Sequence, residues 1–146
     1  MAIFSSFNIS ASGMTAQRLR GDTISQNLAN VNTTRTSDGG PYVRKTVVFA
    51  EKNVTSFDKV LMTTSGLAGN GVKVTKVVKD TETPMNMVYD PAHPDADDNG
   101  YVTYPNVSTI TEMTNLIDAS RAYEANITAF DAAKSMALKG LEINSV

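Results

Sequence analysis

Asp95, Asp97 and Asn99 stand at alternate positions before Gly100, an arrangement that could bind a divalent cation. It matches the first six positions of the calcium loop D-x-[DN]-x-[DN]-G, in which carboxylate and amide oxygens coordinate Ca²⁺. The twelfth position of that loop should be a bidentate glutamate, whereas here it is Asn106. Asp and Asn also form turns without any metal. We therefore expect a structural turn here and no metal ligands.

Other residue types that carry chemistry are scarce. The chain has no cysteine and one histidine, His93, which lies next to a proline. These counts exclude thiol nucleophiles, disulfides, Ser-His-Asp triads and sites built from several histidines. The glycines of residues 66–71 match neither the dinucleotide fingerprint nor the phosphate-binding loop. We expect a protein that is not an enzyme, with no catalytic residue and no cofactor.

Composition limits the remaining classes of protein. A chain of 146 residues with 41% hydrophobic residues has room for one domain. Thirteen basic residues balance fifteen acidic ones, so neither nucleic acid nor an anionic membrane is an expected partner. No small-molecule substrate is expected either. No segment approaches the roughly 20 apolar residues of a membrane span, and the start lacks the features of a cleaved signal peptide. We expect no membrane insertion and an N-terminus that stays uncut.

A long helix is predicted within residues 1–31. Gly13 and Gly21 each cost about 1 kcal/mol relative to Ala inside a helix, but small residues let a second helix approach closely. Asn30 is predicted to end the helix in a left-handed conformation. Apolar and small residues recur at helical spacing and form one stripe: Phe7, Ala11, Met14, Gly21, Ile24, Leu28 and Val31.

Residues 32–105 are predicted to form a loop and a small β-rich middle region. Loop-forming residues occupy its start, and Asn70-Gly71 is a turn signal. Alternating apolar and polar residues then indicate strands. The predicted strands are residues 42–49, 72–78, 87–89 and 101–104.

Residues 106–146 are predicted to form a second long helix. Thr109 and Glu112 have the spacing of a capping box at its start. A periodic segment of about 30 residues follows, which is long beside the average helix of about 11 to 12 residues. Its apolar stripe consists of Met113, Leu116, Ile117, Ser120, Tyr123, Ile127, Phe130, Ala133, Ala137 and Leu141.

These elements predict a mainly α fold with a small β insert. The long N- and C-terminal helices pair as a coiled-coil-like hairpin, and each approaches about 40 Å in length at about 1.5 Å per residue. The middle region is too small to cover them, so the stripes must pair with each other and, where they overhang, with other chains. A closed helical hairpin in a small binding module, with the calcium-loop-like turn, is the alternative that periodicity leaves open.

Several stretches resemble the axial proteins of the bacterial flagellum, which include rod, hook and hook-associated proteins. The two chain ends carry the shared signatures, and the middle is similar to the proximal-rod members. Met14, Leu28 and Val43 depart from the usual residues without breaking the apolar stripe. The short insert argues against distal rod and hook proteins. The matching stretches are residues 10–18, 27–33, 39–45, 88–97, 100–107, 112–117 and 119–126.

The resemblance implies a structural subunit of the periplasmic rod of the flagellar basal body. Such a subunit transmits torque, surrounds the export channel and leaves the cell unfolded through the flagellar type III export apparatus. Its partners are then copies of itself and neighbouring rod and base proteins. The expected subunit-interface residues are Phe7, Ala11, Met14, Ile24, Leu28, Asn30, Met113, Leu116, Ile117, Arg121, Tyr123, Asn126, Ile127 and Phe130.

Overall fold

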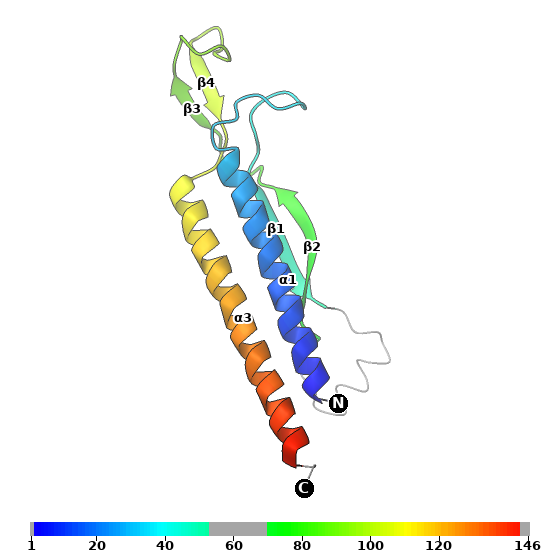
Figure 1. Cartoon of the computed structure of the whole chain (residues 1–146). Helices are drawn as coiled ribbons and strands as arrows, with labels where there is room; N and C mark the ends of the chain where they lie inside the picture. Colours follow the sequence, from blue (N-terminus) through cyan, green and yellow to red (C-terminus); the bar gives the residue numbers. More distant parts are fainter. Residues whose placement is uncertain (1, 53–69, 144–146) are drawn as a thin grey trace.

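A computed structural model describes residues 2–52 and 70–143 of the chain. Two long helices, α1 (Ala2–Ala29) and α3 (Thr109–Ile143), lie side by side along the molecule (Figure 1). Two antiparallel strand pairs accompany them: β1 (Lys45–Glu51) with β2 (Val72–Lys79), and β3 (Asn86–Tyr89) with β4 (Tyr101–Tyr104). The mainly helical fold with a small β insert is therefore confirmed.

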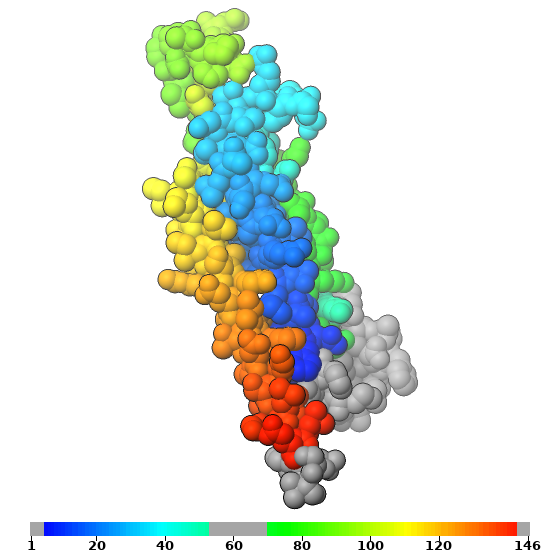
Figure 2. All heavy atoms as spheres, in the orientation of Figure 1, coloured from blue at the N-terminus to red at the C-terminus, as the bar shows by residue number. Residues whose placement is uncertain are grey.

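The two strand pairs occupy different places. The β1–β2 sheet lies along α1, on the side away from α3, whereas the β3–β4 hairpin projects beyond the helices (Figures 1 and 2). The start of β2 is joined to α1, because the backbone N–H of Val72 donates to Ser12 Oγ at 3.1 Å. Gly71 precedes it with a φ of +92°, a conformation that favours glycine. The other glycines of the predicted turn at 66–71 lie outside the described residues.

The first strand begins later than predicted. Tyr42 was assigned to it, but its side chain is buried and its N–H donates to the Thr33 carbonyl at 3.0 Å. Strand pairing starts at Lys45, opposite Lys79, and an irregularity in register separates Val48 from Phe49. The three other predicted strands agree with β2, β3 and β4 to within one residue.

Both predicted helix ends need correction. Among the described residues only glycines have a positive φ, so Asn30 does not adopt a left-handed conformation. Its Nδ2 instead donates to the Gln26 carbonyl at 2.8 Å and satisfies the last helical turn. Ser108, rather than Thr109, caps α3, because its Oγ accepts from the Thr111 N–H at 3.4 Å. Glu112 takes no part in a capping box, since its carboxylate is buried elsewhere.

The two helices meet along small and polar side chains. On α3, Ala119 and Ala133 are buried, and Asn126 is half-buried. Opposite Asn126, a Cβ placed on Gly13 would lie 2.6 Å from its Oδ1, so the helices approach closely where a side chain is absent. Toward the free end, the rings of Phe7 and Phe130 lie 4.9 Å apart.

A buried polar cluster joins the helices to the strands. Glu112 and Asn27 are 0% exposed. Glu112 Oε1 lies 2.8 Å from Arg44 Nε and 2.7 Å from Nη2. Glu112 Oε2 accepts from Asn27 Nδ2 at 2.9 Å. Asn27 Oδ1 in turn accepts from Tyr42 Oη and from the Lys45 N–H, both at 2.9 Å. The buried carboxylate is thus paired and hydrogen-bonded, as burial of a charge requires.

Asn106 extends this cluster to the segment that follows β2. Its Oδ1 accepts from the Arg44 N–H at 2.9 Å, and its Nδ2 donates to the carbonyls of Asp80 and Thr83. Arg44 Nη1 also lies 3.3 Å from Asp80 Oδ2. We call Asn27, Tyr42, Arg44, Asn106 and Glu112 the polar node. It holds the C-terminal end of α1, the N-terminal end of α3 and the ends of both strand pairs together.

Two ionisable groups, one in the node and one beside it, have shifted pKa values. Burial raises the pKa of the Tyr42 phenol above its usual value, and the negative charge of Glu112 adds to this effect. The phenol therefore stays neutral and can donate to Asn27. Hydrogen bonds from the backbone N–H and the hydroxyl of Thr83 lower the pKa of Asp80, with a further contribution from Arg44. Asp80 therefore remains ionised beside the Arg44 guanidinium.

Replacing Glu112 by Gln tests how much the polar node contributes to the stability of the fold. Loss of the buried carboxylate leaves the Arg44 guanidinium with Asp80 alone, so the free energy of unfolding should fall by about 3 kcal/mol. Urea denaturation followed by circular dichroism measures it. Glu142→Gln is the matched control, because its ion pair with Lys139 is exposed and should be worth less than about 1 kcal/mol. Equal effects of the two variants would contradict a structural role for the node.

The glycines of α1 provide a second test. At Gly21 a new Cβ would lie 3.8 Å from Leu116 Cδ1, an ordinary contact, so Gly21→Ala should stabilise the protein by up to about 1 kcal/mol. Gly13→Ala should bring no gain, because Asn126 must move and give up its hydrogen bond to the Ala122 carbonyl. Thermal unfolding of both variants decides this. Adding Asn126→Ala to Gly13→Ala should restore the helical gain if the clash is the cause.

Candidate assembly interface

Many of the predicted interface residues lie inside the chain's own helix pair or close to it. Ile24 is 6% exposed, and Phe7 contacts Phe130. Asn126 faces Gly13, and Leu116 lies beside Gly21. Each of these side chains is buried or half-buried within a single subunit. The full set in this environment is Phe7, Met14, Ile24, Leu28, Asn30, Leu116, Tyr123, Asn126 and Phe130.

The remaining predicted residues lie on the outside. Met113 is 54% exposed, Ile117 51% and Ile127 37%. Ala11 and Arg121 are also exposed. The stripe predicted for the C-terminal helix therefore divides between two faces. One face meets α1, and the other meets no element in the described part of the chain.

The outer face of α3 carries further apolar side chains in line with these. At 3.6 residues per turn, its members fall within an arc of about 140° around the helix. Charged and polar side chains, such as Glu124 and Lys134, stand between them. We call this set the outer α3 row, and it consists of Ile110, Met113, Ile117, Ile127, Leu138 and Leu141.

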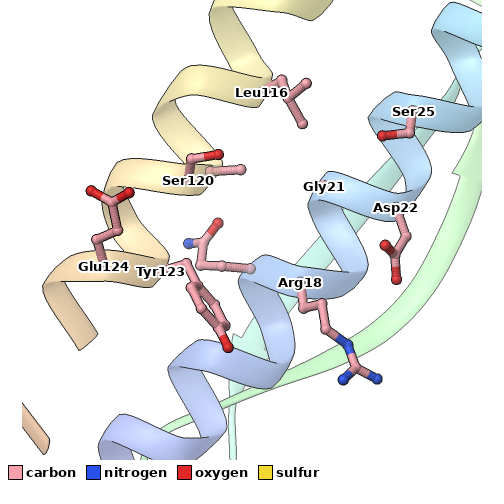
Figure 3. A pocket seen from close by; sticks show the side chains of 10 residues that line it. Arg18, Gly21, Asp22, Ser25, Leu116, Ser120, Tyr123 and Glu124 are labelled. Atoms are coloured by element: carbon pink, nitrogen blue, oxygen red, sulfur yellow. The ribbon is translucent and has the colours of Figure 1, made fainter. Parts of the chain in front are cut away.

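A groove runs between the two helices at the middle of their length. It has a volume of about 340 Å³ and is lined by residues of both helices, among them Gln17, Gly21, Ser25 and Tyr123. Figure 3 shows the side chains of Leu116 and Tyr123 directed toward α1 around Gly21. Within the part of the chain that the structure describes, Gln17 Oε1 is buried and has no hydrogen-bond partner. The groove thus has space for a side chain, and one of its lining residues carries a buried acceptor without a partner.

The turn that resembles a calcium loop uses its oxygens within the chain. Asp95 Oδ2 accepts from Thr34 Oγ1 at 2.8 Å, and its Oδ1 pairs with Arg35 at 2.6 Å. Asp97 Oδ1 accepts from the N–H groups of Asn99 and Tyr101. The predicted structural turn is therefore present. Among the described residues, no three or more His, Cys, Asp or Glu side chains are grouped as metal ligands.

Reasoning from sequence missed the residues that position this interface. Asn27, Arg44 and Glu112 were not predicted as a buried group, and Ala119 was not assigned to the contact between the helices. One signal was available in the sequence. Asn27 follows the apolar Ile24 by three positions, so the two residues lie on the same side of the helix. Helical periodicity alone cannot show that such a residue is buried, because its partners lie far away in the sequence.

None of the helices in the described residues is long and apolar enough to cross a membrane.

Two family models match this chain at its two ends. The model described as "Flagella basal body rod protein" matches residues 7–35. The model described as "Flagellar basal body rod FlgEFG protein C-terminal" matches residues 98–143. Together they cover most of α1 and all of α3, the two long helices of the fold.

Curated relatives match nearly the whole chain. The flagellar basal-body rod protein FlgC of Bacillus subtilis is 49% identical, with 98% of this chain and 99% of the relative covered. FlgC of Borreliella burgdorferi is 47% identical, with 98% of each chain covered. FlgC of Salmonella typhimurium is 40% identical, again with 98% of each chain covered. The chain belongs to the FlgC family of flagellar basal-body rod proteins.

Proposed function

We propose that this chain is a structural subunit of the proximal rod of the flagellar basal body, and that it assembles through its terminal helices. The observation that carries the proposal is the outer α3 row, which lies exposed on a long helix of a rod-family protein. Covering one such side chain stabilises an assembly by roughly 1.5 to 3 kcal/mol. A neighbouring rod subunit supplies the cover.

The spacing of the inner face of α3 supports a coiled-coil-like pairing with α1. Buried and half-buried side chains recur at alternating steps of four and three residues, the pattern of a left-handed coiled coil. In this proposal residues 1–31 and 106–146 form the helical core of the rod, and residues 32–105 project from it. The recurring positions on α3 are Glu112, Leu116, Ala119, Tyr123, Asn126, Phe130, Ala133 and Ala137.

The groove around Gly21 offers a second point of contact for a neighbouring helix. Its 340 Å³ is space that a single inserted side chain can occupy. A donor on that side chain would satisfy Gln17 Oε1, which has no partner within the described chain. Exposed Arg121 is a candidate for bonds to a neighbour from α3, whereas Asn126 contributes to the subunit's own helix pair.

Helices packed around a common axis would surround the export channel and transmit torque along the periplasmic rod. Export through the flagellar type III apparatus requires an unfolded chain. The absence of cysteine and the two glycines within α1 suit such a passage, because no crosslink resists unfolding. The alternative of a small binding module receives no support from the relatives, all of which are named as rod proteins.

Ile117→Asp tests the outer α3 row. It forfeits the burial of an apolar side chain and places a charge in an apolar contact. We expect the variant to be expressed and folded, because Ile117 is 51% exposed in the subunit. It should nevertheless be absent from purified basal bodies, and the cells should not swim. Ala125→Asp is the matched control, on an exposed position of another flank of α3, and should be incorporated. Normal motility with Ile117→Asp would refute the proposed interface.

Amide hydrogen exchange tests whether the helices are completed only by assembly. In the isolated subunit, protection should be strongest near Asn27 and Glu112, where the node holds both helices, and should fall toward Ser5 and Gly140. Ends whose apolar side chains lack a partner recover little of their ordering entropy. Uniform strong protection along both helices of the monomer would instead indicate a closed module.

A further inference from the structure

Gln17 carries a polar atom that the subunit itself leaves without a partner. Its Oε1 is buried and accepts no hydrogen bond within residues 2–52 and 70–143. Gln17 lines the groove of about 340 Å³ between α1 and α3. A neighbour that covers this groove also excludes solvent from it. Because a buried acceptor without a donor is costly, the side chain that enters the groove must donate a hydrogen bond.

The walls of the groove favour a donor that is positively charged. Asp22 and Glu124 line it, with Arg18 as the one cation. Figure 3 shows the two carboxylates on opposite helices, and neither forms an ion pair within the described part of the chain. The side chain of Tyr123 is directed toward α1 and offers a ring on which a guanidinium can stack. An arginine combines several donors, a fixed charge and a planar group that stacks on aromatic rings.

Arg121 is an exposed arginine on α3 that has no ion pair among the described residues. It follows the buried Ala119 by two positions, so it lies about 160° around the helix from the side that meets α1. Its guanidinium therefore cannot reach the acceptor in the groove of its own subunit. It stands one turn after Ile117, so a neighbour that covers the outer α3 row also meets this arginine.

This arginine lies at the height of Gln17 along the molecule. The two helices run in opposite directions (Figure 1), and two contacts between them mark the levels. Gly13 faces Asn126, and Gly21 lies beside Leu116. Gln17 is midway between the two glycines, and the arginine is midway between their two partners on α3. A second copy placed beside this one at the same height therefore brings its arginine level with the buried acceptor.

We propose that Arg121 of one copy of this chain inserts into the groove of a second copy beside it. There its guanidinium donates to Gln17 Oε1 and pairs with the carboxylate of Asp22 or Glu124. The inference rests on the proposed function, because the rod is the assembly that holds copies side by side. Two different surfaces meet in this contact, so it continues from copy to copy around an axis. The bond fixes neighbouring copies at one height.

Chemical crosslinking in purified basal bodies tests the contact, and the chain has no cysteine of its own. Cells produce one copy with Thr114→Cys, two turns before Arg121 on the same face of α3, and another with Ser25→Cys in the groove wall. Both positions are exposed and lie at nearly the same height. We expect a short bismaleimide to join the two copies. Ala132→Cys is the matched control for Thr114→Cys, because it lies on the same face about 27 Å further along α3, and it should give no product.

Removing the donor or the acceptor tests which bond orders the contact. Arg121→Met in the Thr114→Cys copy should lower the crosslink yield about tenfold, the scale of a hydrogen bond to a charged group. Gln17→Met in the Ser25→Cys copy should do the same. Both changes together should lower the yield no further than either alone, because they remove the same bond. Lys134→Met removes an exposed charge elsewhere on α3 and should leave the yield unchanged.

The outcomes separate this inference from the proposed function. If both cysteine copies are present in basal bodies but give no joint product, or Ser25→Cys is joined to another protein instead, the contact between copies is wrong and the rod assignment stands. Equal yields with Thr114→Cys and Ala132→Cys overturn it in the same way. If the losses from Arg121→Met and Gln17→Met add, the two side chains do not bond to each other. If the unmodified chain is absent from basal bodies, the proposed function fails, and this inference fails with it.

Discussion

The arrangement of this subunit depends on burying one carboxylate, that of Glu112. A charge without water must be paired and hydrogen-bonded, and its partners here come from distant parts of the sequence: Arg44 before β1 and Asn27 on α1. Because Arg44 and Asn106 also bond to each other and to Asp80, the same group fixes where both strand pairs leave the helices. Apolar packing alone would leave those positions poorly defined, because the hydrophobic effect has no directionality.

The node lies at one end of the helices, and this location has consequences along their length. Away from it, α1 and α3 meet both through small residues, such as Gly13 and Ala119, and through larger side chains, such as the Phe7–Phe130 pair. The small residues let the helices approach closely, but each of them buries little apolar surface. Other large apolar side chains of α3, such as Ile117, are exposed, and in the proposed assembly a neighbouring chain covers them. The polar node fixes the positions of the elements at one end of the helices, whereas apolar side chains along α3 stay exposed. This arrangement suits the proposed assembly, in which neighbouring chains cover those side chains.

The sequence by itself determined the two long terminal helices, the β insert and the family, because periodicity and signature motifs are local properties of the chain. The turn at residues 95–100 was also predictable, since the Asp97 side chain accepts from the backbone N–H groups of Asn99 and Tyr101 nearby in the sequence. Only the tertiary structure decided which side of α3 meets α1. The predicted stripe included Phe130 and Ala133, which are covered in the helix pair, but also Ile117, which is exposed. Ala119 was outside the stripe and is buried, and Asn126 fits the contact because Gly13 lacks a side chain opposite it. The role of Glu112 was hidden for the same reason: a glutamate near a helix start predicts a cap, and its burial depends on an arginine 68 positions away.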